Sequence, residues 1–155
     1  MAGIGEAASI VGVIQVAAQV VKLCGGYLSE VNYARQDIER LRSKALALQG
    51  VLEHAQRIVE DSKSGRLPVS NSVLESLKQC VSDLQLLRTK LNPGKRRKIM
   101  KSFGLRALKW PFTKMEFEKT VEVLDGYTTT FNTALLADQL SARPLLIDLT
   151  HMLTK

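Results

Sequence analysis

The side chains that most often carry out catalysis are few in this chain of 155 residues, and they are not grouped at useful spacing. The two histidines, His54 and His151, have no cysteine and no second histidine at the spacing of a metal site. No Gly-x-Ser-x-Gly, P-loop or Gly-x-Gly-x-x-Gly motif occurs, so neither a catalytic serine nor a phosphate-binding loop is indicated. The sequence therefore predicts a protein that is not an enzyme and that binds no metal or other cofactor.

Chemistry of another kind, the binding of anions, is indicated by a basic strip from Arg88 to Lys114. The basic strip holds ten Lys or Arg and no acid, whereas the rest of the chain holds 12 basic and 15 acidic residues. Lys and Arg beside aromatic residues are typical of a segment that binds anionic lipid headgroups. The residues predicted to contact lipid are Lys95, Arg96, Arg97, Lys98, Lys101, Arg106, Lys109 and Trp110.

Three alternatives for the basic strip stay open. A charged helix face is often simply solvated. Trp110 and Phe112, which flank Pro111, could instead close the end of a helix-bundle core. Nucleic acid is the partner least expected, because a Lys-Arg-Arg-Lys run is a frequent chance match and no recognition-helix or RNA-binding motif accompanies it.

A second feature with chemical consequences is the uncharged stretch from Ala7 to Val21. Extended to Leu28, the stretch meets a single charge, Lys22. Twenty-two helical residues span about 33 Å, and the hydrocarbon core of a bilayer is about 30 Å thick. The segment is therefore long enough to cross a membrane, but its glutamines also suit a helix of a soluble bundle.

Small and polar residues recur on one stripe of this helix, and apolar residues lie roughly opposite. Small residues let helices approach closely, and glutamines form hydrogen bonds between helices that contribute about 0.6–2 kcal/mol each. Lys22 lies near one end and can extend toward the headgroups. We therefore predict that the helix inserts when several copies assemble. The residues predicted to carry insertion and assembly are Ile10, Gly12, Ile14, Gln15, Gln19 and Lys22.

Apolar residues at heptad-like spacing indicate that helices hold these features in place. The expected helices cover residues 4–28, 33–61, 71–91, 96–109 and 113–140. No strand pattern is present. The predicted fold is all-α: an antiparallel bundle of four to five helices, with an apolar N-terminal helix.

Individual residues refine this prediction. Thr113 and Glu116 match a capping box at the start of the last long helix. Pro144 is expected to break that helix, which gives a bundle over residues 1–143 and a tail or short helix over residues 144–155. Cys24 and Cys80 lie in apolar patterns, so we expect reduced core cysteines in a cytosolic protein.

Four motifs occur in order along residues 1–140, and together they resemble the fungal HeLo-like N-terminal domain. The motifs are Ala7–Leu23, then Asp37-Ile38-Glu39-Arg40-Leu41-Arg42 with Leu48-Gln49-Gly50-Val51-Leu52, then Lys109-Trp110-Pro111-Phe112, and the helix from Glu116 through Tyr127 and Phe131 to Gln139.

This resemblance implies a helical bundle from a fungal protein of innate-immunity type, where such domains often precede a nucleotide-binding oligomerisation domain. Related HeLo domains cause cell death by exposing the N-terminal helix and attacking the plasma membrane, and their architecture is similar to the four-helix bundle of animal necroptosis. The implied partners are anionic membrane lipids, further copies of the chain, and an upstream signalling or nucleotide-binding oligomerisation protein. The implied location is cytoplasmic at rest and the plasma membrane on activation.

The preferred function is therefore a membrane-targeting effector domain that causes cell death. The alternative is a regulatory protein–protein interaction module, homotypic or adaptor, without membrane activity of its own.

Overall fold

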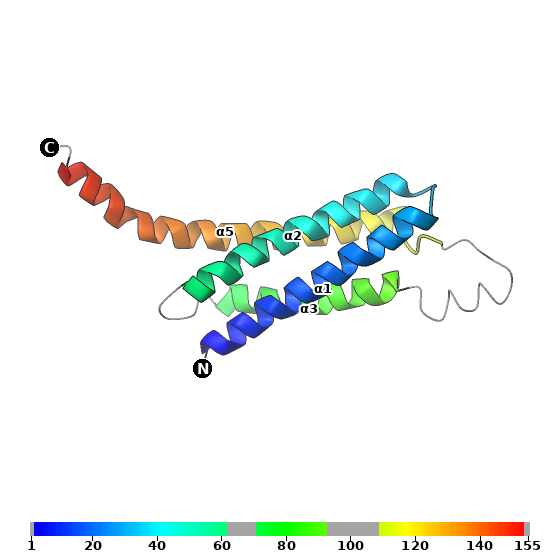
Figure 1. The fold of residues 1–155 in the computed structure, drawn as a ribbon, viewed down its shortest axis with the longest axis horizontal. Helices are drawn as coiled ribbons and strands as arrows, with labels where there is room; N and C mark the ends of the chain where they lie inside the picture. The colour runs from blue at the N-terminus through cyan, green and yellow to red at the C-terminus, as the bar shows by residue number, and fades with distance from the viewer. Residues whose placement is uncertain (1, 62–70, 93–108, 154–155) are drawn as a thin grey trace.

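The computed structural model describes residues 2–61, 71–92 and 109–153, with side chains for residues 10–60, 72–92 and 109–137. Its helices are α1 (Ala2–Glu30), α2 (Arg35–Asp61), α3 (Asn71–Leu91) and α5 (Lys114–Leu153). The chain direction alternates from each of these helices to the next (Figure 1). The described residues contain no strand. The predicted all-α bundle is confirmed. The short helix predicted over residues 96–109 lies almost entirely outside the described residues.

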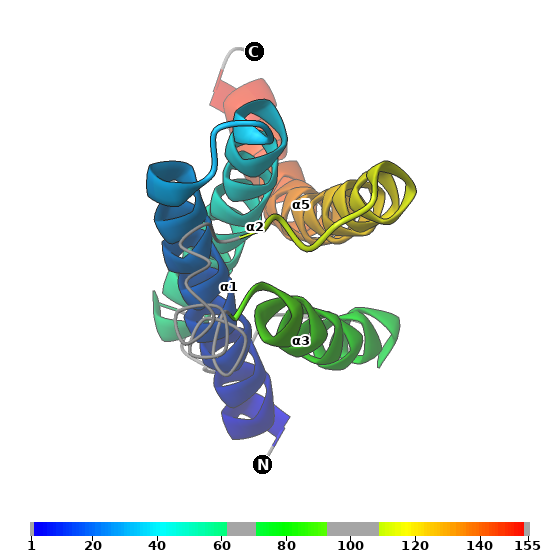
Figure 2. The same cartoon turned by 90° about the vertical axis from the view of Figure 1, so that its right-hand side faces the viewer.

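The pairs of neighbouring helices differ in how extensively they contact each other. α1 packs against α2 and α3, and α2 also packs against α5, whereas α3 and α5 contact each other least. Figure 2, which looks along the bundle, shows α1 and α5 at opposite corners. The exposed ion pairs Arg40–Glu118 at 2.7 Å and Lys44–Asp125 at 3.1 Å join α2 to α5. Such exposed pairs contribute about 0–1 kcal/mol each, so packing holds the bundle together.

The core consists of the apolar side chains whose spacing predicted the helices. All seven α2 residues of this pattern are buried, namely Ile38, Leu41, Ala45, Leu48, Leu52, Ala55 and Val59. The α3 pattern buries Leu77, Cys80, Leu84, Leu87 and Leu91. The α5 pattern buries Phe117, Val121, Leu124, Phe131 and Leu135. Residues three or four apart fall on one face of a helix, which is why the sequence could place them.

Both cysteines are free and buried, as predicted. Burial raises the pKa of the Cys24 thiol to about 12 and that of the Cys80 thiol to about 12. The thiolate is the reactive form of cysteine. The two thiols therefore act as small apolar side chains at neutral pH.

The two predictions for α5 have opposite outcomes. The capping box is confirmed: the Glu116 N–H donates to Thr113 Oγ1 at 3.2 Å, and the Thr113 N–H donates to Glu116 Oε2 at 3.3 Å. The break expected at Pro144 is wrong, because α5 continues to Leu153 across the boundary predicted between residues 143 and 144. A proline removes one hydrogen-bond donor and crowds the preceding turn, which can bend a long helix without ending it. The far end of α5 curves and extends beyond the other helices (Figure 1).

Candidate functional site

An aromatic cluster of Tyr27, Trp110, Phe112 and Phe117 closes one end of the core. The Trp110 ring centroid lies 5.3 Å from that of Tyr27, 5.0 Å from Phe112 and 6.3 Å from Phe117. The main-chain N–H of Trp110 donates to Tyr33 Oη at 2.8 Å. Only 9% of Trp110 is exposed. This position favours the alternative that Trp110 and Phe112 close the core, and in this fold the Trp110 ring is not available as a lipid anchor.

Tyr27 connects α1 to two places in the basic strip, one on each side of its centre. Its hydroxyl donates to the Leu91 carbonyl oxygen at 2.8 Å, at the C-terminal end of α3. Its ring packs edge-on against Trp110. Leu91 precedes residues 93–108 and Trp110 follows them, and these residues lie outside the described part of the chain. One α1 side chain thus contacts the chain just before and just after the centre of the basic strip.

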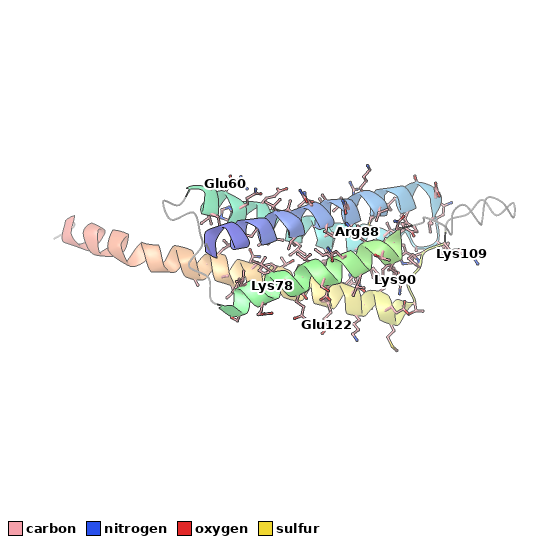
Figure 3. All side chains as sticks on the ribbon, turned by 90° about the horizontal axis from the view of Figure 1, so that it is seen from below. Glu60, Lys78, Arg88, Lys90, Lys109 and Glu122 are labelled. Atoms are coloured by element: carbon pink, nitrogen blue, oxygen red, sulfur yellow. The ribbon has the colours of Figure 1, made fainter. Side chains whose placement is uncertain are left out.

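Most of the residues predicted to bind lipid cannot be placed. Lys95, Arg96, Arg97, Lys98, Lys101 and Arg106 lie outside the described residues. Lys109 is exposed and lies toward the same end of the bundle as Arg88 and Lys90 (Figure 3). Arg88 Nη1 donates to Gln19 Oε1 at 2.5 Å, so the strip also contacts α1 through its first residue. Lys90 Nζ pairs with Glu116 Oε2 at 2.6 Å and lies 4.9 Å from the centre of the Phe112 ring.

The six α1 residues predicted to act in insertion lie on two faces of the helix. Ile10 is buried in the core. Gly12 and Ile14 are half-buried, and Gln15, Gln19 and Lys22 are exposed. The apolar face of α1 therefore packs against its neighbours, and the polar stripe faces solvent.

One described helix is long and apolar enough to cross a membrane, over Ile10–Glu30. A core helix of a soluble protein and a signal sequence meet the same criterion. Within the bundle, 39% of an 18-residue apolar stretch of this segment is buried, and its buried side chains belong to the core.

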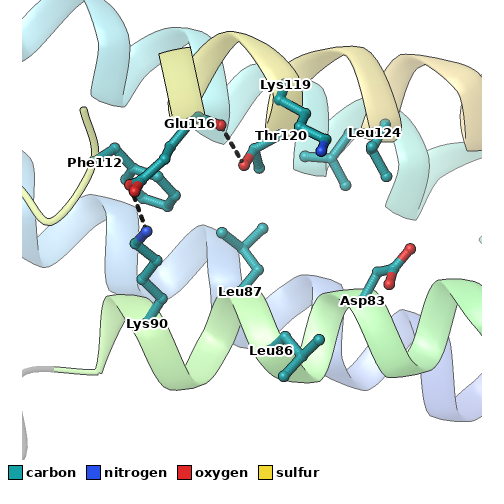
Figure 4. Close-up of a pocket in the computed structure, with 10 residues that line it drawn as sticks. Asp83, Leu86, Leu87, Lys90, Phe112, Glu116, Lys119, Thr120 and Leu124 are labelled. Atoms are coloured by element: carbon teal, nitrogen blue, oxygen red, sulfur yellow. Dashed lines mark hydrogen bonds and ion pairs between the residues drawn. The ribbon is translucent and has the colours of Figure 1, made fainter. Parts of the chain in front are cut away.

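A groove of about 370 Å³ lies between α3 and α5 (Figure 4). Its apolar lining is Leu86, Leu87, Phe112, Val123 and Leu124, and its polar lining is Asp83, Lys90, Glu116, Lys119 and Thr120. The sequence analysis did not identify this α3/α5 groove. The available signal was an apolar residue beside each core position, because Leu86 precedes Leu87 and Val123 precedes Leu124. Leu86 is 68% exposed and Val123 is 37% exposed.

Charged groups in the α3/α5 groove differ in their partners. The bonded ammonium of Lys90 and the main-chain N–H of Thr113 hold the pKa of Glu116 below its usual value of 4.5. Asp83 accepts a hydrogen bond from Tyr127 Oη, and burial together with this bond raises the pKa of Tyr127. Lys119 forms no ion pair or hydrogen bond with the described residues.

Acid is expected to weaken the fold through Glu116. Its pKa is lowered in the folded state, so its contribution to stability is complete above the unfolded pKa and is lost as the pH falls through the folded value, below 4.5. The urea midpoint of Glu116→Gln should therefore fall less than that of the wild type between about pH 6 and about pH 3. Glu122→Gln, an exposed acid on the same helix, is the control and should follow the wild type. Equal acid sensitivity in all three proteins would show that Glu116 makes no such contribution.

No family model matches the chain, and comparison with curated proteins and with solved structures finds no similar protein. The resemblance to the HeLo-like domain thus stays a prediction from the sequence. Among the described residues, no group of three His, Cys, Asp or Glu side chains could hold a metal ion.

Proposed function

We propose that this chain is a membrane-active effector domain whose α1 helix leaves the bundle and enters an anionic membrane when copies gather. The observation that carries this proposal is the double contact of Tyr27 with Leu91 and Trp110. When headgroups bind the Lys and Arg between Leu91 and Trp110, the chain rearranges at both of these contacts with Tyr27. Lipid binding then weakens the attachment of α1 at the same time as it brings the bilayer close.

The destination of α1 decides whether it can leave the bundle. Over residues 10–30, where its side chains are described, the buried ones are Ile10, Val13, Val16, Ala17, Val20, Cys24 and Tyr27. Exposing this face to water would cost on the order of 10 kcal/mol, at roughly 1.5–3 kcal/mol for each large side chain. In the hydrocarbon core of a bilayer, the same apolar side chains are again shielded from water. Release into water is therefore excluded, whereas release into a bilayer leaves the polar side chains of α1, and the faces of α2 and α3 that α1 covered, to be accommodated.

The register of α1 in the membrane follows from its charged residues, of which Lys22 lies farthest from the two ends of the helix. A span over Ile10–Glu30 would place Lys22 near the bilayer centre, at a cost of about 2.5–3.5 kcal/mol. A span over residues 4–23 places Glu6 near one end and Lys22 near the other, where the ammonium of Lys22 reaches the headgroups. We adopt the second register. Gln15 and Gln19 then lie within the hydrocarbon and form hydrogen bonds between copies, which makes insertion depend on assembly.

The second candidate function is a protein–protein interaction module without membrane activity of its own. The α3/α5 groove favours it, because an apolar groove flanked by charged residues suits a partner helix. This module would bind its partner whether or not lipid is present.

Dye release from vesicles separates the two functions. Under the membrane proposal, the purified chain releases dye from vesicles that contain anionic lipid, releases little from neutral vesicles, and loses activity as salt screens the attraction. The interaction module releases no dye from either kind of vesicle. Absence of release from anionic vesicles at low salt, at every protein concentration tested, would reject the membrane proposal.

Replacing Tyr27 with Phe tests the attachment of α1. The variant loses the hydrogen bond to Leu91, worth about 0.5–1.5 kcal/mol, and keeps the buried ring. We expect half-maximal dye release at a protein concentration about 2–10-fold lower than for the wild type. Tyr127→Phe is the matched control, because it removes a hydroxyl bonded to Asp83 between α5 and α3, away from α1. Equal shifts in the two variants would contradict a specific role for Tyr27.

A further inference from the structure

The α3/α5 groove is long enough to bind about two turns of a helix. Its α3 wall runs from Asp83 to Lys90 and its α5 wall from Glu116 to Leu124, each at the three- and four-residue spacing of one helix face. Seven residues of helix rise about 10 Å, or about two turns. The apolar lining lies between charged residues at both ends of the α3 wall, as in grooves that receive amphipathic helices.

The far end of α5 has the sequence of such a helix. We call residues 138–153 the distal α5 segment, which is helical and extends beyond the other helices (Figure 1). On a helix of 3.6 residues per turn, six apolar positions fall within one stripe about 120° wide. These positions are Ala142, Leu145, Leu146, Leu149, Met152 and Leu153. Asp148 borders the stripe on one side and Arg143 on the other.

The charges of the groove and of the distal α5 segment are complementary. Lys119 stands on the α5 wall, without a recorded partner among the described residues, and Asp83 stands on the α3 wall (Figure 4). The hydrogen-bond partner of Asp83 is the hydroxyl of Tyr127, which adds no positive charge to this wall. An amphipathic helix with an acid on one border and a base on the other suits these two walls, with Asp148 toward Lys119 and Arg143 toward Asp83.

We propose that the distal α5 segment of one copy docks in the α3/α5 groove of a second copy. A chain cannot fill its own groove in this way, because α5 is itself one wall and its distal segment continues away from the groove (Figure 1). The contact is heterologous, since each copy offers a segment at one place and a groove at another, and repetition gives a ring or an open filament. The inference does not depend on membrane activity. Where both hold, this assembly is what gathers the α1 helices.

Two variants of the full chain each disrupt one side of the contact. The groove variant carries Leu86→Glu and Val123→Glu, at two exposed positions outside the buried core. The distal variant carries Leu146→Glu and Leu149→Glu. The mass of the wild type, measured by light scattering, should rise with protein concentration. Each variant alone should keep the mass of one chain, with helix content unchanged by circular dichroism.

A mixture of the two variants gives the decisive result. The groove variant still offers a distal α5 segment, and the distal variant still offers a groove, so one contact forms between them and no further copy can add. The mixture should therefore reach twice the mass of one chain and stop there. This limit is expected when the distal α5 segment of one copy binds the groove of another, and not when two grooves or two distal segments pair with each other.

Three outcomes would overturn the inference: a wild type that keeps the mass of one chain at all concentrations, variants that assemble like the wild type, or a mixture that shows no association. Binding of a single-chain anionic amphiphile by the monomeric wild type, lost in Lys119→Ala, would assign the groove to lipid and also overturn the inference. Dye release measured on the same samples keeps the two proposals apart. A chain that releases dye without assembling in solution refutes this inference alone, because copies can still gather on the membrane. A chain that assembles without releasing dye refutes the membrane proposal alone.

Discussion

Trp110→Ala is expected to lower the free energy of unfolding by about 3–5 kcal/mol, the usual cost of deleting a large buried aromatic side chain. Trp110 is 9% exposed and contacts three other rings, which belong to α1, α5 and the segment before α5. Its removal leaves a cavity where these elements meet. Urea unfolding followed by circular dichroism measures the loss without relying on tryptophan fluorescence.

Trp110→Phe is the informative control. Trp110 Nε1 is buried without a hydrogen-bond partner among the described residues. An unsatisfied buried donor costs about 1–3 kcal/mol, and phenylalanine removes it while it keeps most of the ring contact. The Phe variant should therefore lie within about 1.5 kcal/mol of the wild type. If Trp110 served only as a surface anchor for lipid, both substitutions would leave stability unchanged, which would contradict its place in the core.

The long-range order of the helices was predictable because it rests on repetition. The seven buried α2 residues follow one 3-4 pattern, and any helix with that pattern must cover its apolar face. The capping box of Thr113 and Glu116 was predictable for a related reason, because its two hydrogen bonds join residues three apart in the sequence.

Features that join distant parts of the chain were not predictable. Nothing in the spacing around Tyr27 indicates that its hydroxyl reaches Leu91, 64 residues away. The α3/α5 groove lies between the two neighbouring helices that contact each other least, which the apolar pattern of either helix alone does not encode. The sequence left open whether Trp110 binds lipid or closes the core, since an aromatic residue beside lysines suits both. The burial of Trp110 and its packing against rings from α1 and α5 distinguish them.

The exposed stripe of α1 allows a test that leaves the core intact. Deleting the helix would remove its buried face, so the bundle would unfold under either candidate function. Gln15 is exposed, and it forms no hydrogen bond with a described side chain. A carboxylate at this position is solvated in the folded bundle. The free energy of unfolding of Gln15→Glu, measured in urea, should therefore lie within about 0.5 kcal/mol of the wild-type value.

Gln15→Glu is nevertheless expected to reduce dye release from anionic vesicles by about 100-fold. In a span over residues 4–23, position 15 lies close to the bilayer centre, where an ionised side chain costs about 2.5–3.5 kcal/mol. A cost near 2.7 kcal/mol corresponds to about 100-fold for each inserted helix, and copies that share a pore add their costs.

Gln36→Glu on α2 supplies the matched control, because it makes the same change of charge at another exposed glutamine. Both variants are attracted to the membrane equally by net charge, so a difference between them isolates the entry of α1 into hydrocarbon. If the two variants release dye equally, α1 does not enter the bilayer at residue 15 and the proposed insertion is wrong, even if the chain still binds anionic lipid through the basic strip.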